Sequence, residues 1–139
     1  MHTGSLTARF AASGCGCFEW GLVMVNAFIQ ERELFPPAIP FRSGFLPRDK
    51  HEIYYEQCGN IDGQSLLFLH GGPGAEIAPT HRRLFDPKRF HVVLFDQRGC
   101  GQSRPHASLD DNQTGALIGD IEALRKSLNI NKFVLFGGS

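Results

Sequence analysis

The 139-residue sequence has no excess of charge of either sign and no long hydrophobic run. Lys plus Arg and Asp plus Glu both number 14, so the chain lacks the positive field that attracts nucleic acids or anionic membranes. Its longest apolar stretch, residues 22–29, is interrupted by Asn26 and falls short of the ~20 residues that span a bilayer. We therefore expect neither a nucleic-acid-binding protein nor a membrane protein.

Cysteine is also sparse, and its spacing does not form a zinc site. The four cysteines are Cys15, Cys17, Cys58 and Cys100, and they supply no C-x-x-C pair with a second pair or with paired histidines. The lone Cys15-Gly16-Cys17 string is too weak a pattern to predict metal binding. We interpret the cysteines as unlinked thiols in a reducing compartment, which favours a cytoplasmic protein.

Residues 1–31 form a predicted N-terminal extension, either disordered or involved in targeting. A stretch rich in Ser, Ala and Gly after Arg9 precedes the apolar residues 20–29. Secretion is disfavoured because Gln-Glu-Arg-Glu at 30–33 stands where a signal-peptide cleavage site should lie. An organelle transit peptide fits somewhat better, although Arg9 is its only strong base. We favour an unprocessed or wrongly assigned extension before a folded region over 32–139.

The composition, with 42% hydrophobic and 20% charged residues, is that of a globular domain. Three short apolar runs without polar alternation, at 66–69, 92–95 and 133–136, indicate strands of a parallel sheet covered on both faces. Before the last run, apolar residues recur at helical spacing, and Glu122 lies four residues before Lys126. The apolar stripe consists of Leu117, Ile121, Leu124 and Leu128. These patterns predict an α/β fold with a largely parallel sheet and flanking helices.

The segment before the first apolar run is punctuated by prolines up to Pro47, which indicates extended chain and turns. Residues 52–58 are rich in β-forming side chains, and Asp62-Gly63 separates them from the run at 66–69. We predict that these two segments pair as a hairpin. A short helix is expected within 75–89, which makes the order strand, strand, strand, helix, strand, helix, strand.

Each parallel run ends in a glycine-rich or polar turn, and ligands of open α/β sheets bind beyond those carboxyl ends. The turn at 70–74 reads His-Gly-Gly-Pro-Gly, and glycines allow its backbone amides to approach a substrate and form an oxyanion hole. The loop at 96–103 carries Asp96 and Arg98, which we interpret as loop-organising residues in preference to catalytic ones. Gly137-Gly138-Ser139 forms the first half of the G-x-S-x-G nucleophile elbow.

Together these three turns resemble those of proline iminopeptidases. The resemblance begins at about Glu33 and extends through Ile-Tyr-Tyr-Glu-Gln-Cys-Gly at 53–59 to the last residue. It implies the N-terminal half of an α/β-hydrolase fold, without the cap and the C-terminal half, and a serine peptidase that releases N-terminal proline from peptides. It also implies a Ser-Asp-His triad with no metal and no cofactor.

The resemblance assigns roles to individual residues. Ser139 would be the nucleophile, the amide of Gly72 would donate to the oxyanion, and Gly71 and Gly74 would shape the substrate-binding loop. In this fold the triad acid and the triad base both follow the serine along the chain. The six histidines and Asp96 all precede Ser139. None of the histidines is therefore a good triad base, and Asp96 is a poor triad acid. We therefore expect these 139 residues alone to be inactive.

Two alternatives remain open, and the sequence does not predict the oligomeric state. The same turns serve α/β-hydrolases that act on esters, epoxides or small amides. The chain could also be a truncated, non-catalytic product, in which the last strand exposes an apolar edge that favours association.

Overall fold

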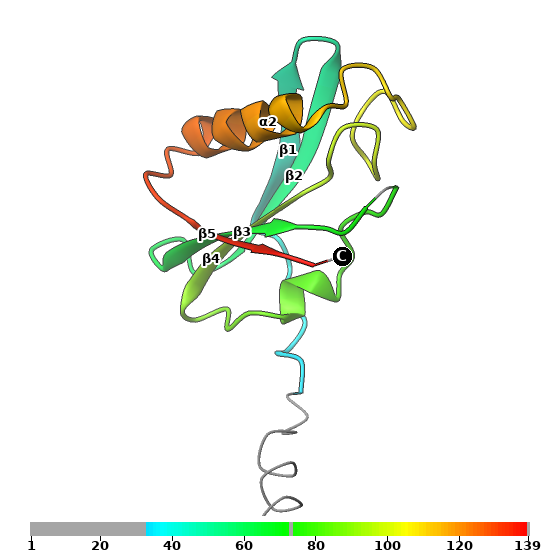
Figure 1. The fold of residues 1–139 in the computed structure, drawn as a ribbon. Coiled ribbons are helices and arrows are strands. Elements are labelled where there is room, and N and C mark those ends of the chain that lie inside the picture. The colour runs from blue at the N-terminus through cyan, green and yellow to red at the C-terminus, as the bar shows by residue number, and fades with distance from the viewer. Residues whose placement is uncertain (1–32, 73, 139) are drawn as a thin grey trace, which may run out of the picture. The chain divides into compact units, whose positions relative to one another are not determined.

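The computed structural model describes residues 33–72 and 74–138, and Leu34 begins a single compact unit. Its centre is a mixed sheet with the strand order β1-β2-β4-β3-β5, shown in Figure 1. The elements in chain order are β1 (Arg42–Arg48), β2 (His51–Gly59), β3 (Gln64–Leu69), the 3-10 turn η1 (His81–Arg83), β4 (Phe90–Phe95), α2 (Thr114–Ser127) and β5 (Val134–Gly137). The predicted extension at 1–31 lies outside the described residues, so the division at residue 32 stays a prediction.

The three predicted apolar runs form β3, β4 and β5, and these strands are parallel to one another. Leu67 pairs with Val93 of β4 on one side and with Leu135 of β5 on the other. The connections between parallel strands need crossovers of a dozen or more residues. The chain supplies them as the segment containing η1 and the segment containing α2. The predicted α/β architecture is therefore confirmed.

The predicted hairpin between 52–58 and 66–69 is wrong. β2 instead pairs antiparallel with β1 through the turn at Asp49, whose positive φ of 49° suits a tight reversal. On its other side β2 pairs antiparallel with β4, which separates it from β3. The proline-containing segment thus forms β1, an edge strand of the sheet. Pro47 is tolerated there because an edge strand pairs on one side only.

The amphipathic helix is present as α2, whereas the predicted short helix within 75–89 is reduced to η1. The predicted pairing of Glu122 with Lys126 is not what the structure contains. Glu122 instead accepts hydrogen bonds from Arg125, with 2.9 Å between Oε2 and Nη2. Three-residue spacing also places side chains side by side on a helix, so Arg125 competes for the same carboxylate.

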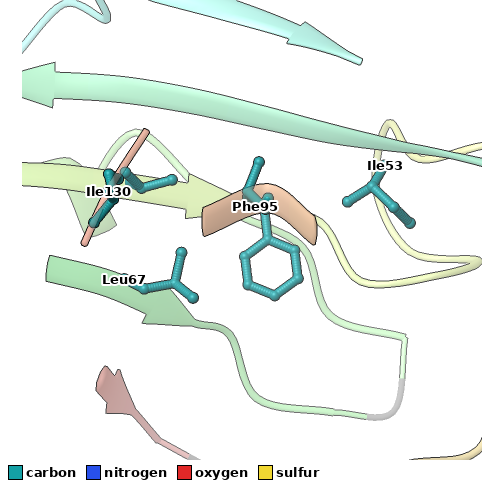
Figure 2. Packing of buried hydrophobic residues seen from close by; sticks show 6 residues of the cluster. Ile53, Leu67, Phe95 and Ile130 are labelled. Carbon is teal, nitrogen blue, oxygen red and sulfur yellow. The ribbon is translucent and has the colours of Figure 1, made fainter. Parts of the chain in front are cut away.

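Apolar side chains from β3 and β4 pack on both faces of the sheet. The face toward α2 buries a cluster of six residues, four of which are labelled in Figure 2: Ile53, Leu67, Phe95 and Ile130. The opposite face buries Cys58, Leu66, Phe68, Phe85, Val92 and Leu94. Alternate residues of each strand point to opposite faces, which explains why these runs show no polar alternation.

β5 differs from the other two apolar runs. Its three apolar residues remain half exposed, with Leu135 at 54%. Within the described part of the chain β5 has only β3 as a neighbour, and the Phe136 ring packs against the rings of Phe68 and Phe85. Within the described residues β5 is therefore less covered than β3 and β4.

Candidate active site

A cleft of about 880 Å³ lies at the carboxyl ends of β3 and β4. Its walls come from the turn after β3, the loop after β4, the segment at 106–112 and Leu117 of α2. Gly72, Gly74, Gln97 and Arg98 are among the lining residues. Parallel neighbours end at the same edge of the sheet, which brings these segments, far apart in sequence, to one place.

The turn after β3 is held by the buried imidazole of His70. The backbone N–H of Gln97 donates to Nε2 of His70 at 3.0 Å, so this nitrogen carries no proton. Nδ1 therefore carries the proton, and it lies 2.7 Å from the carbonyl oxygen of Gly71, which accepts it. The side-chain amide of Gln97 also donates to the His70 carbonyl at 3.0 Å. The hydrogen bonds between His70 and Gln97 hold the turn after β3 against the loop after β4.

The glycines of this turn leave its backbone open to the cleft. No atom lies within 4 Å of the position where a Cβ would stand on Gly72, and the same holds for Gly74. Gly74 also has a positive φ of 82°, a conformation that side-chain-bearing residues rarely adopt. Gly71 is less exposed than these two, and its carbonyl is the acceptor for His70. The roles predicted for Gly71, Gly72 and Gly74 stay predictions.

Asp96 is buried at the start of the loop after β4 and joins two loops. Its Oδ1 accepts the N–H of Ile77 and its Oδ2 accepts the N–H of Gln102, each at 2.8 Å. Burial raises the pKa of Asp96, and the two amide donors offset part of this rise. Gly101 fits beside the carboxylate only because it has no Cβ. Asp96 thus joins the loop after β4 to the segment at Ile77, and its predicted role as a loop-organising residue stays a prediction.

Arg98 is buried, and an ion pair with Asp120 of α2 fixes its side chain. Nε and Nη2 of Arg98 donate to the two oxygens of Asp120 at 2.6 and 2.8 Å. Nε of Arg48 donates to Oδ1 of the same carboxylate at 2.9 Å. The hydrogen bond to Asp120 is the main cause of the raised pKa of Arg98. This cluster joins the cleft wall to α2 and to β1.

Sequence reasoning missed two residues that shape the site. Neither Gln97 nor Asp120 stands out in the sequence pattern, although Gln97 is the second residue after the buried strand β4 and lies between Asp96 and Arg98. A polar residue at the end of one parallel strand lies beside the turn of its neighbour, so Gln97 carried a usable signal. Asp120 gave a weaker one: a carboxylate one residue before Ile121 in the apolar stripe of α2.

Ser139 itself lies outside the described residues, so its predicted place in the site is untested. Gly137, the last residue of β5, pairs with Leu69. The chain therefore leaves β5 beside the point where the turn at His70 begins. This register is compatible with a nucleophile elbow next to the turn after β3.

The described residues supply no metal site and no membrane-spanning helix. Among residues 33–72 and 74–138, no group of three or more His, Cys, Asp or Glu side chains could hold a metal ion. In the same part of the chain, no helix is both long and apolar enough to cross a bilayer. Cys58 and Cys100 are free thiols. Burial raises the pKa of Cys58 to about 11 and is also the main cause of the raised pKa of Cys100.

Residues 64–139 match the family model described as the alpha/beta hydrolase fold. The chain therefore belongs to the α/β-hydrolase family, as its parallel strands and the cleft at their carboxyl ends suggested. This match confirms the predicted fold class.

Within that family, the chain is similar to proline iminopeptidases. It is 52% identical over 109 residues to a probable proline iminopeptidase of Leptolyngbya boryana, covering 78% of this chain and 34% of the relative. It is 50% identical over 115 residues to the proline iminopeptidase of Arabidopsis thaliana, covering 82% and 30%. The chain thus spans about a third of the length of these curated relatives.

A solved structure shows the same likeness. The proline iminopeptidase-related protein of Thermus thermophilus superposes with a TM-score of 0.60 at 33% identity, covering 69% of this chain and 35% of that one. The predicted resemblance to proline iminopeptidases is therefore confirmed.

Proposed function

We propose that this chain forms the first part of a prolyl aminopeptidase, a serine hydrolase that releases N-terminal proline from peptides. The observation that carries the proposal is the identity of 50–52% to two proteins named proline iminopeptidase. The cleft supports it, because its glycine turn lies where an α/β-hydrolase forms its oxyanion hole. Peptides with an N-terminal proline are the proposed partners, and no metal or cofactor takes part.

In the proposed reaction, Ser139 attacks the carbonyl carbon of the terminal proline. A histidine that is not among these 139 residues takes the hydroxyl proton. It passes this proton to the leaving amine as the peptide bond breaks. Water then attacks the acyl-enzyme, which releases proline and restores the serine. The N–H of Gly72 donates to the oxyanion that forms in each half of the reaction. Gly72 is exposed and lines the cleft, which supports this role.

The 139 residues alone are expected to be inactive. In this fold the triad acid and base follow the serine along the chain. The described histidines nearest the cleft have other tasks, since Nε2 of His70 already accepts the amide of Gln97. Among the described residues, Nδ1 of His106 lies 3.1 Å from the carbonyl oxygen of Gly101. We assign the proposed protein to the cytoplasm because Cys58 and Cys100 are free thiols.

A chimera tests the proposal. Residues 34–139 replace the matching segment of the Leptolyngbya boryana relative, and purified protein is assayed with proline 4-nitroanilide, alanine 4-nitroanilide and 4-nitrophenyl acetate. We expect the chimera to prefer the proline substrate. Ser139→Ala should lower kcat by about 10⁴-fold or more, whereas Ser43→Ala, on the edge strand β1, should leave it unchanged.

Two results would contradict the proposal. A folded chimera that hydrolyses the ester but not proline 4-nitroanilide would assign these residues to a different α/β-hydrolase activity. Equal cleavage of the proline substrate by the chimera with and without Ser139→Ala would contradict the serine mechanism. It would still support the proposed substrate class.

A further inference from the structure

The peptide unit between Gly71 and Gly72 contains a hydrogen-bonded carbonyl as well as the amide proposed as an oxyanion donor. Nδ1 of His70 donates to the carbonyl oxygen of Gly71 at 2.7 Å, and the N–H of Gly72 belongs to the same peptide unit. A trans peptide unit is planar, so its C=O and N–H bonds point in opposite directions. The cis bond recorded among the described residues is Arg104–Pro105, so this unit is trans. The hydrogen bond from His70 therefore sets the direction of the Gly72 N–H.

The backbone of Gln97 fixes the imidazole of His70 from its other nitrogen. The N–H of Gln97 donates to Nε2 at 3.0 Å, which places the ring proton on Nδ1, where it can be donated to Gly71. In the other neutral tautomer two N–H groups would face each other at Nε2, and Nδ1 would have no proton to donate. His70 is also buried, so the loss of either partner would leave a buried ring nitrogen without a hydrogen bond.

The side chain of Gln97 fixes a second peptide unit of the same turn. Its Nε2 donates to the carbonyl oxygen of His70 at 3.0 Å. The same nitrogen lies 3.4 Å from Nδ1 of His70, but both nitrogens carry protons and neither accepts there. The amide nitrogen faces the His70 carbonyl because the amide oxygen in its place would meet another acceptor.

Gly71 thus lies between two peptide units that are both held by hydrogen bonds. Its φ and ψ are the soft rotations between the His70 carbonyl and the Gly72 N–H, and glycine restricts these rotations less than other residues do. Gln97 holds the carbonyl before Gly71, and His70 holds the carbonyl after it. Apart from its chain neighbours, no atom lies within 4 Å of a Cβ position on Gly72. The hydrogen bonds therefore supply an orientation that packing at this position does not.

We propose that His70 and Gln97 are positioning residues that aim the N–H of Gly72 at the oxyanion. The inference rests on the proposed function, in which this amide is an oxyanion donor. Gln97 acts through His70, and His70 acts through the carbonyl of Gly71. Neither side chain takes part in proton transfer. An amide that is already aimed stabilises the developing charge without reorienting during the reaction.

Direct contact with the substrate is the competing role for Gln97, because this residue also lines the cleft. The two roles have different kinetic signatures. The oxyanion exists only in the transition states and tetrahedral intermediates, so an amide that loses its aim lowers kcat and leaves KM nearly unchanged. Loss of a contact with the bound substrate raises KM instead.

The chimera with the Leptolyngbya boryana relative tests the proposal, with proline 4-nitroanilide and 4-nitrophenyl acetate as substrates. Gln97→Met keeps the side-chain length and the backbone N–H but removes the side-chain donor. We expect kcat to fall by about tenfold to a hundredfold, which is less than the ~10²–10³-fold loss of a whole oxyanion donor. KM should change by less than about twofold.

Gln64→Met is the matched control. The side-chain amide of Gln64 also donates to a backbone carbonyl, that of Ser65 at 3.3 Å. Gln64 is, however, the first residue of β3, whereas the turn at His70 follows the last. Its replacement should leave both kcat and KM unchanged. Circular dichroism measures the folded fraction of every variant, and each rate is divided by that fraction.

Gln97→Glu separates positioning from general support of the fold. An ionised carboxylate cannot donate to the His70 carbonyl, whereas the protonated carboxyl donates one hydrogen bond to it. The kcat of this variant, divided by that of the unchanged chimera, should therefore rise as the pH is lowered from 8 to 5. The same ratio for Gln97→Met should stay constant. Asp96 and His81 interact electrostatically with His70, but they titrate in all of these proteins, so their effects cancel in the ratio.

Conservative rescue tests His70. The side-chain nitrogen of asparagine lies close to the position of the histidine Nδ1, so His70→Asn keeps a donor for the carbonyl of Gly71. His70→Leu removes this donor. We expect the kcat of His70→Asn to exceed that of His70→Leu by at least about threefold, which is the effect of one modest hydrogen bond.

Four results would overturn the inference while leaving the proposed function intact. These are an unchanged kcat in Gln97→Met, a raised KM with unchanged kcat, a kcat ratio for Gln97→Glu that does not vary with pH, and equal kcat in the two His70 variants. A chimera that hydrolyses only the ester would instead contradict the proline substrate. The same ratios measured with the ester would then decide the positioning role, because ester hydrolysis also forms an oxyanion.

Discussion

Removal of the Asp120 carboxylate is expected to destabilise the folded chain more than any other change to a charged group on α2. Asp120 is 1% exposed and Arg98 is 3% exposed, so Asp120→Ala leaves a buried guanidinium without its counterion. Breaking such a buried pair typically costs about 3–5 kcal/mol. We expect the lower part of this range, because Arg48 remains 30% exposed and can turn to solvent.

Urea denaturation followed by circular dichroism measures the effect. With a slope of about 1.5 kcal/mol per molar urea, a loss of ~3 kcal/mol moves the midpoint down by roughly 2 M. Glu122→Ala is the matched control, because it removes a carboxylate from the same helix but breaks an exposed pair with Arg125. Its midpoint should stay close to that of the unchanged chain.

A double variant tests the physical reason. Replacing both partners, as Arg98→Met with Asp120→Leu, removes the buried charge as well as its counterion, so it should cost less than Asp120→Ala alone. The reasoning is refuted if Asp120→Ala shifts the midpoint no more than Glu122→Ala does. It is refuted equally if the double variant is less stable than the single one.

Three further predictions concern backbone shape, thiol reactivity and pH. Gly101→Ala should destabilise the fold, because the added Cβ would overlap the Asp96 carboxylate and the φ of Gly101 is +48°. Gly115→Ala has open space around it and should raise the unfolding free energy by up to about 1 kcal/mol. Urea midpoints measure both effects. Cys58, with its pKa near 11, should react with iodoacetamide at pH 8 only after unfolding, as peptide mass spectrometry would show, and equal labelling in native and urea-unfolded protein would contradict this. The pKa of His91 is lowered from 6.5 by burial, so the unfolded chain binds the proton more tightly and stability should fall as pH drops below about 6.5. Urea midpoints taken between pH 7.5 and 5.5 measure how steeply stability falls with pH, and His91→Gln should make this fall shallower. An unchanged pH dependence would refute the assignment of the effect to His91.

The parts of the site that the sequence predicted share one property: each depends on local pattern. The runs at 66–69 and 92–95 are apolar without alternation because both sheet faces are covered, and the glycines of the turn after β3 are needed where the backbone meets the cleft. Asp96 and Arg98 stand out as charged residues within three positions of the end of a buried strand. Such signals lie within a few residues of one another and can be read without knowing what else packs nearby.

Strand partners are the feature that local pattern predicts least well. Adjacent β-forming segments separated by a turn usually form a hairpin, which predicts that β2 pairs with β3. The structure pairs β2 with β1 and β4 instead. Hydrophobicity does not distinguish these pairings, since β1, β3 and β4 all offer β2 a suitable edge. In the structure β4 lies between β2 and β3, and side chains on both of its faces are buried.

By itself the sequence determined the class of fold, the turns that follow β3 and β4, and the resemblance to proline iminopeptidases. Only the tertiary structure decided which side chains hold those turns in place. Gln97 reaches back 27 residues to His70, and Asp120 joins Arg98 to Arg48, which lies 72 residues before Asp120. Contacts over such separations depend on how whole strands and helices pack, and local residue preferences carry no information about that packing.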